Sequence, residues 1–224
     1  LIWSAENNAT HFGQMYYPAT TQGTATPIDN TSGPYPLLIW IGADGEANDQ
    51  YDWLGMHLAK AGYITIVLPP DWNSADTQNQ CLSILYLWYR LEFNHNNGSF
   101  QGDPENMRDA FDLHHWGIGG HGLGAKQAAQ CQLILSGAWS EFVSLPLPTA
   151  LVALGLENVN TDITDESLGP SPQPGMGLYL TGTLDNLAKA NTNVEQWLDE
   201  QSIPLHYMSV IGANHVQYQD ESCW

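Results

Sequence analysis

The chain has 224 residues, of which 43% are hydrophobic and nine are tryptophan. This is enough apolar material to build a sizeable core, which excludes a disordered tail. Five basic residues against 24 acidic ones give a formal charge of −19, and such a surface repels phosphate backbones and anionic lipids. We therefore expect a globular protein that binds neither nucleic acid nor a membrane, and no apolar run reaches the length of a membrane span.

The first half of the chain alternates apolar runs with an amphipathic segment. The run 37–41 is continuously apolar, as a buried parallel strand would be. The segment 51–62 has helical spacing, and its apolar side consists of Trp53, Leu54, Leu58 and Ala61. In chain order we predict a strand at 14–20, a strand at 37–41, a helix at 51–62, a strand at 63–68 and a helix at 76–91.

The second half continues the same alternation. We predict a strand at 115–120, a helix at 123–135, strands at 149–156 and 175–182, a helix at 193–201 and a last strand at 205–212. Apolar strands that alternate with helices indicate an α/β fold with a doubly wound, mostly parallel sheet. The sequence shows no internal repeat and no interdomain linker, so we expect one domain over residues 1–224.

Three polar positions follow predicted strands, where loops at the carboxyl ends of a parallel sheet collect reactive groups. Gly122 is the apex of "GGHGLGA", which has the frame of the strand–turn–helix motif Gly-x-Ser-x-Gly with glycine in place of serine. Asp185 and His215 follow the next-to-last and last predicted strands. Nucleophile turn, acid and histidine is the chain order of the α/β-hydrolase triad.

On these motifs the chain resembles the secreted α/β-hydrolases grouped around dienelactone hydrolases, cutinase-like polyester hydrolases and chlorophyllase-type esterases. "DLHHWGIGGHGLGA" is similar to that family's nucleophile stretch, "YPLLIWIGADG" to its oxyanion strand, "TGTLDNLA" to its acid loop and "GANH" to its histidine loop. The resemblance spans roughly residues 15–220. It implies an α/β-hydrolase fold, carboxylic ester hydrolase ancestry, no cofactor, and oxyanion donors at the backbone N–H groups of Ala43 and Leu123.

The departures from this family bear directly on activity. Gly122 stands where the family has its nucleophilic serine, and glycine has no atom that can attack a carbonyl. His115 stands where the family usually has arginine, and Ala125 replaces the second glycine of the turn. The resemblance makes Asp185 and His215 the other triad members, and a pair of this kind can also persist only because each satisfies the other's hydrogen bonds.

The remaining histidines and the acidic loops are expected to be structural. His121, next to the apex, is predicted to point into the fold or toward helix packing, and histidine is common at this position in the family that the chain resembles even when the serine is present. His114 and His115 are predicted to be surface or packing residues, because no ligand spacing supports a metal site. The loops "DGEAND" and "NVNTD" lack a glycine and a closing glutamate at the positions where a calcium-binding loop has them, so we expect no metal.

Cysteines, glycosylation sequons and the charge favour an extracellular location. Cys81, Cys131 and Cys223 allow at most one bridge within the chain, and the sequence leaves their pairing open. Sequons occur at Asn8, Asn30 and Asn97, each in a polar, loop-like setting. No signal peptide is visible at Leu1, and a mature secreted chain would look the same.

The segment after His215 ends at "ESCW", without the closing helix that the family normally has there. This predicts self-association at the last strand, or further chain that covers it.

Three functions follow from the residues. The first is a non-catalytic relative that binds a small ester or polymer-like ligand or serves in assembly. The second is a serine ester hydrolase whose nucleophile has been substituted. The third, a carbohydrate- or surface-binding module, has only the tryptophans in its favour.

Overall fold

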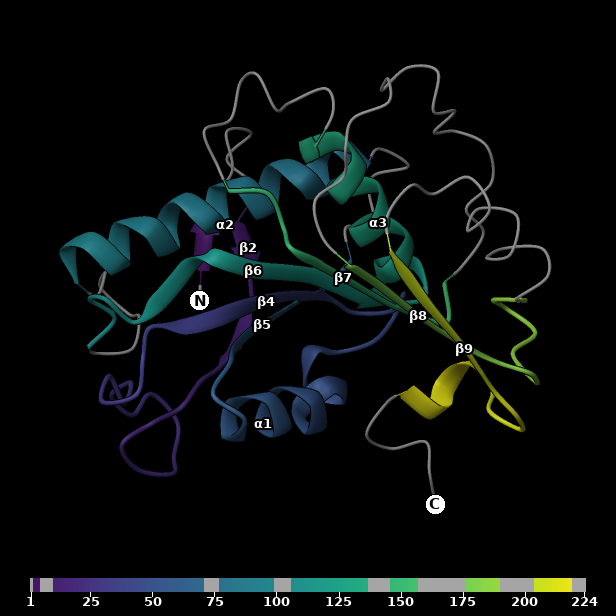
Figure 1. Ribbon diagram of the computed structural model, residues 1–224, viewed down its shortest axis with the longest axis horizontal. Coiled ribbons are helices and arrows are strands. Elements are labelled where there is room, and N and C mark those ends of the chain that lie inside the picture. The colour runs from purple at the N-terminus through teal and green to yellow at the C-terminus, as the bar shows by residue number, and fades with distance from the viewer. Residues whose placement is uncertain are drawn as a thin grey trace.

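The structure is a computed structural model that describes residues 2–4, 10–70, 77–98, 106–136, 146–156, 176–189 and 204–218. A seven-stranded sheet has the order β3-β5-β4-β6-β7-β8-β9, in which β3 is antiparallel to β5 and all other neighbours are parallel (Figure 1). The strands are β3 (Gln14–Tyr16), β4 (Tyr35–Ile41), β5 (Ile64–Leu68), β6 (Phe111–His121), β7 (Ala150–Leu154), β8 (Met176–Gly182) and β9 (Leu205–Val210). A separate antiparallel pair, β1 (Ile2–Ser4) with β2 (Thr10–Phe12), is not predicted from the sequence.

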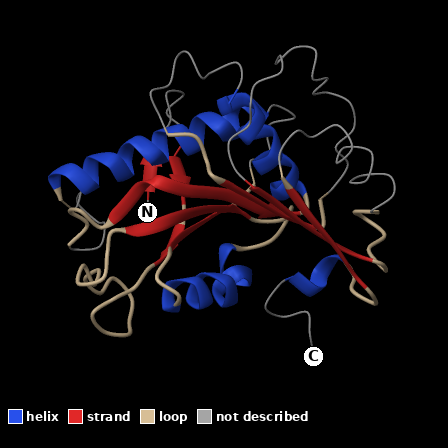
Figure 2. Cartoon of the chain, in the orientation of Figure 1, coloured by secondary structure: helices blue, strands red, loops and turns tan. Residues whose placement is uncertain are grey.

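Helices cover both faces of the sheet (Figure 2). One face carries α2 (Thr77–Asn97) and α3 (Leu123–Ser136), and the other carries α1 (Asp52–Lys60) with the short helices η1 (Asn48–Tyr51) and η3 (His215–Tyr218). The α/β architecture with a mostly parallel sheet is therefore as predicted.

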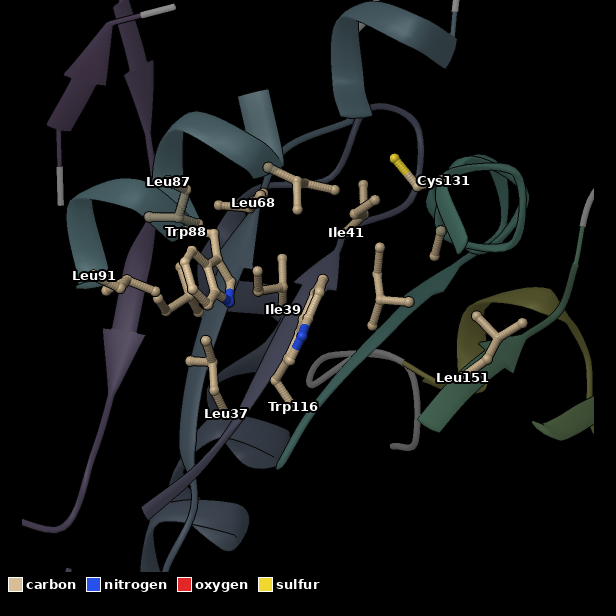
Figure 3. Close-up of a cluster of buried hydrophobic side chains, with 14 of the residues drawn as sticks. Leu37, Ile39, Ile41, Leu68, Leu87, Trp88, Leu91, Trp116, Cys131 and Leu151 are labelled. Atoms are coloured by element: carbon tan, nitrogen blue, oxygen red, sulfur yellow. The ribbon is translucent and has the colours of Figure 1, made fainter. Parts of the chain in front are cut away.

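Alternation along the central strands builds a core on each face. In β4, Leu37, Ile39 and Ile41 pack with side chains of α2 and α3 in the larger core (Figure 3). Trp40, between them in sequence, lies in a smaller cluster with Tyr51, Val67 and Leu154. A strand that is apolar at every position is thus explained by burial on both faces, as the run 37–41 predicts.

A disulfide joins the two helices of the larger face. Cys81 of α2 and Cys131 of α3 are bonded, with their Cα atoms 5.3 Å apart, and both side chains are fully buried. Of the pairings that the sequence leaves open, the structure contains this one. Cys223 lies outside the described residues.

Several predicted boundaries and faces need correction. Trp53 is 41% exposed instead of buried, because α1 turns Gly55 toward the sheet, where a Cβ atom would lie 2.2 Å from the ring of Tyr16. The helix α2 continues to Asn97, so that sequon stands at a helix end and not in a loop. The strand β6 begins at Phe111, earlier than predicted. The predicted helix at 193–201, the loop "NVNTD" and the sequon at Asn8 lie outside the described residues.

Candidate active site

The predicted nucleophile turn is present in the structure. β6 ends at His121, Gly122 has a φ of +57°, and α3 begins at Leu123. This left-handed conformation is one that glycine adopts at little cost and that most residues resist. The N–H of Gly122 donates to the carbonyl oxygen of Leu154 at 2.9 Å, which ties the turn to the end of β7.

Close backbone contact explains why position 124 is glycine. A Cβ atom on Gly124 would lie 2.2 Å from the carbonyl oxygen of Gly42 and 2.3 Å from that of Ile41. The first turn of α3 therefore touches the end of β4 directly, and only glycine fits. At the next position Ala125 is accommodated and is fully buried.

The predicted acid and histidine are hydrogen-bonded to each other. Nδ1 of His215 lies 2.9 Å from Oδ2 of Asp185, and the two residues are 8% and 4% exposed. The other oxygen of Asp185 accepts the backbone N–H groups of Leu187 at 3.0 Å and Ala188 at 2.7 Å. Both oxygens of the carboxylate are thus fixed by the loop after β8 and by the imidazole.

This arrangement orients the histidine as a triad does. A carboxylate only accepts hydrogen bonds, so Nδ1 of His215 carries the shared proton. In the neutral ring Nε2 is then the basic nitrogen, which is the tautomer needed to take a proton from a nucleophile. Gly155, which no sequence motif singles out, lies directly against the pair: a Cβ atom there would be 3.2 Å from both Oδ2 of Asp185 and Nδ1 of His215.

His121 points into the fold as predicted, and it contacts the candidate site and residues of the short helices η1 and η3. Its ring lies 4.6 Å from that of His215, centroid to centroid, and its Nε2 is 2.9 Å from the backbone carbonyl oxygen of His215. Its Nδ1 is 3.0 Å from the hydroxyl of Tyr51. Because His121 precedes Gly122 in the chain, these contacts place the Asp185–His215 pair beside the turn.

Tyr51 is the residue that sequence reasoning missed altogether. It is fully buried at the end of η1, and its hydroxyl accepts the N–H of Ala43 at 2.8 Å. The Ala43 N–H predicted as an oxyanion donor is therefore engaged within the protein. The second predicted donor, Leu123, is the first residue of α3, where helix N–H groups lack intrahelical acceptors. No sequence pattern around Tyr51 indicates this role, because tertiary contacts determine where η1, which carries Tyr51, lies.

Tyr218 packs against His121 beside the candidate site. It ends η3, its ring lies 5.4 Å from that of His121 in an edge-on arrangement, and its buried hydroxyl has no hydrogen-bond partner in the described part of the chain. Burial raises the pKa of Tyr218 to about 12, and the charge of Asp185 adds to this shift. The phenol is thus strongly held in its neutral form.

His114 and His115 lie in the first half of β6 and are exposed. Nδ1 of His115 is 2.7 Å from Oδ2 of Asp112. Burial raises the pKa of Asp112, but this bond and the N–H groups of His114 and His115 lower it overall.

Within the described ranges, no three His, Cys, Asp or Glu side chains gather as a metal site would require. Nor does any helix there have the length and apolarity to cross a membrane.

Comparison with known proteins supports the fold. No family model matches the sequence, and no curated protein matches it either. Among solved structures, the chain is similar to a protein of unknown function from Agrobacterium tumefaciens that is provisionally classed as an alpha/beta hydrolase. The TM-score is 0.64 with 15% identity, over 96% of this chain and 86% of that one. The chain therefore has the α/β-hydrolase architecture.

Proposed function

We propose that this protein is a non-catalytic relative of the serine ester hydrolases, which binds an ester or polymer-like ligand without forming an acyl-enzyme. The observation that carries the proposal is Gly122, whose lack of a side chain leaves no nucleophile at the turn between β6 and α3. Loss of a triad member typically removes several orders of magnitude of catalysis.

Ancestry as a carboxylic ester hydrolase is supported by the Asp185–His215 pair. The bond of 2.9 Å, the burial of both groups and the direction of the shared proton are what a triad needs. The same observation favours the alternative, a serine ester hydrolase whose nucleophile alone has been replaced. The two readings differ in whether glycine is this protein's own residue at position 122 or has replaced a serine there.

An extracellular location is part of this proposal, and the Cys81–Cys131 disulfide supports it because such bonds persist in oxidising compartments. The sequon at Asn30 adds little. The side-chain amide of this asparagine donates to the backbone carbonyl oxygens of Asn106 and Arg108, so a glycan, which replaces one of the two amide hydrogens, would have to displace at least one of these bonds.

The test compares the natural chain with His215→Ala on p-nitrophenyl acetate. A non-catalytic protein turns the ester over at the same slow rate with or without the imidazole, within about twofold. A natural chain that is faster than the variant by about tenfold or more would show that the pair performs chemistry without a serine, and would overturn the proposal. Circular dichroism of both proteins confirms that the comparison is between folded molecules.

A second candidate function, assembly of two copies, is favoured by the exposed edge of the sheet. β9 pairs only with β8 among the described strands, and it carries Tyr207 at 39% and Met208 at 54% exposure. Other exposed apolar side chains lie near the same edge: Met176, Leu184, Leu187, Val210, Ile211 and Val216. Edge strands with this character are usually blunted by charge, bulges or cover.

Charge makes a second copy the best occupant of this edge. Asp185 is the only acidic residue in 176–189 and 204–218, and it is buried. Among the described residues, this edge therefore presents no exposed carboxylate to a second copy of a chain of charge −19, and pairing of β9 strands about a twofold axis would be self-complementary.

Analytical ultracentrifugation tests this assembly. The natural chain should form a dimer that Met208→Lys abolishes, because a lysine on an edge strand opposes pairing. Met56→Lys, on α1 and 51% exposed, is the matched control and should leave the dimer intact. A natural chain that stays monomeric at high concentration, or a dimer that survives Met208→Lys, contradicts the second candidate.

A further inference from the structure

A hydrogen-bonded chain of buried groups crosses the candidate site from the end of β4 to the histidine loop. It runs from the N–H of Ala43 to the hydroxyl of Tyr51 at 2.8 Å, from there to Nδ1 of His121 at 3.0 Å, and from Nε2 of His121 to the carbonyl oxygen of His215 at 2.9 Å. Tyr51 and His121 are both fully buried. Neither belongs to the triad frame.

The direction of each hydrogen bond follows from the chemistry of its two ends. The carbonyl oxygen of His215 can only accept, so Nε2 of His121 carries the ring proton. Burial disfavours a charged imidazolium, so the ring is neutral and its Nδ1 is an acceptor. The hydroxyl of Tyr51 must then donate to Nδ1. Since the Ala43 amide can only donate, the Tyr51 oxygen also accepts from it.

We propose that Tyr51 caps the Ala43 N–H and so determines whether this site can accept a carbonyl oxygen. A ligand oxygen and the Tyr51 oxygen are both acceptors, and they compete for one donor. The Tyr51 proton cannot help the ligand, because it is committed to His121. The meaning of Ala43 as an oxyanion donor rests on the proposed ancestry, whereas the cap itself is a feature of the hydrogen bonds alone.

Packing holds the cap in place. The ring of Tyr51 lies edge-on to that of His121, 6.1 Å between centroids, and 5.9 Å from that of Trp40. Its Cε2 would be 3.1 Å from a Cβ atom on Gly42, so the ring lies directly over the end of β4. A carbonyl oxygen can therefore bond to the Ala43 N–H only where the Tyr51 hydroxyl no longer occupies it.

Tyr51→Phe tests the cap, because it removes the hydroxyl and keeps the ring. In the natural chain, NMR should show His121 as the Nε2–H tautomer, a hydroxyl proton on Tyr51 in slow exchange with water, and a cross peak from that proton to the Ala43 amide. In Tyr51→Phe the Ala43 amide should exchange with solvent faster by about tenfold or more. Tyr16→Phe, which removes a tyrosine hydroxyl that bonds to Asp52 instead, is the control and should leave Ala43 unchanged.

The functional arm uses a serine introduced at the turn. Gly122→Ser with Tyr51→Phe should exceed Gly122→Ser alone in kcat/KM on p-nitrophenyl acetate by about tenfold or more, since one freed oxyanion donor is worth up to about 100- to 1000-fold. Where Gly122→Ser alone is active, a double variant that is no faster, or slower, overturns the proposal that the cap controls ligand access.

The NMR measurements test the cap independently of the proposed ancestry. If neither serine variant is active, the ester hydrolase ancestry fails, and the cap still stands or falls on Ala43. An Ala43 amide that exchanges as quickly in the natural chain as an open amide would overturn the cap. So would an Nδ1–H tautomer of His121. The Ala43 exchange rate and the His121 tautomer are both measured on the natural chain, so the test remains even if Tyr51→Phe folds poorly.

Discussion

Removal of the disulfide should cost this protein a large part of its stability. Cys81 and Cys131 are 50 residues apart in the chain, and closing a loop of that size lowers the entropy of the unfolded state by an amount worth about 4 kcal/mol at 25 °C. Replacing both cysteines with alanine keeps the buried position apolar. For a domain of this length the loss corresponds to a fall in Tm of roughly 8–16 °C.

Urea and thermal unfolding, followed by circular dichroism, measure the loss. Cys223→Ala is the matched control, and it should change the free energy of unfolding by less than about 0.5 kcal/mol if that thiol makes no bridge. Reductant should act on the natural chain only as the protein unfolds, because both bridged sulfurs are buried. A loss below about 1 kcal/mol in the double variant would refute the loop-closure reasoning.

Three further predictions concern the site and its surroundings. Gly124→Ala should destabilise the fold by about 1–3 kcal/mol in chemical unfolding, because its Cβ atom would lie 2.2 Å from a backbone oxygen after β4; an unchanged midpoint would contradict this close contact. Gly155→Ala, at a φ of +51°, should cost about 1–2 kcal/mol and shift the NMR signals of the His215 ring, since its Cβ atom would lie 3.2 Å from the Asp185–His215 hydrogen bond; an unmoved ring signal would count against it. Because the pKa of Tyr218 is raised from 10.0 to about 12, the folded state keeps this proton longer than the unfolded state, so stability should hold below pH 10 and fall as the pH rises toward 12. Tyr218→Phe should reduce that alkaline loss in pH-dependent unfolding, and an identical profile would show that the phenol does not contribute.

The sheet and two residues of the candidate site, Asp185 and His215, can be predicted from the sequence for a physical reason. Strands such as 37–41 are buried on both faces, so a continuous apolar run is their signature. Asp185 and His215 are recognisable because each follows a predicted strand, and the carboxyl ends of parallel strands meet along one edge. Local sequence and strand order together are enough to bring them to the same place.

Tertiary contacts decide what the sequence could not predict. Tyr51 ends the short helix η1, and its burial depends on Trp40 of β4 and His121 of β6. The exposure of Trp53 follows from the packing of Tyr16 on Gly55, a contact between segments about 40 residues apart that no helical pattern encodes. The bridge between Cys81 and Cys131 required the packing of α2 against α3.

The central claim is that Gly122 is what separates this protein from a working ester hydrolase, and Gly122→Ser tests it most directly. The measurement is p-nitrophenyl acetate turnover by Gly122→Ser, by Gly122→Ser with His215→Ala, and by Gly122→Ala, which adds a Cβ atom at the same φ of +57° without a hydroxyl. We predict a gain of orders of magnitude for the serine variant, lost in the other two, because a hydroxyl beside the Asp185–His215 pair restores the triad. A folded Gly122→Ser that is no more active than the alanine variant would contradict the claim.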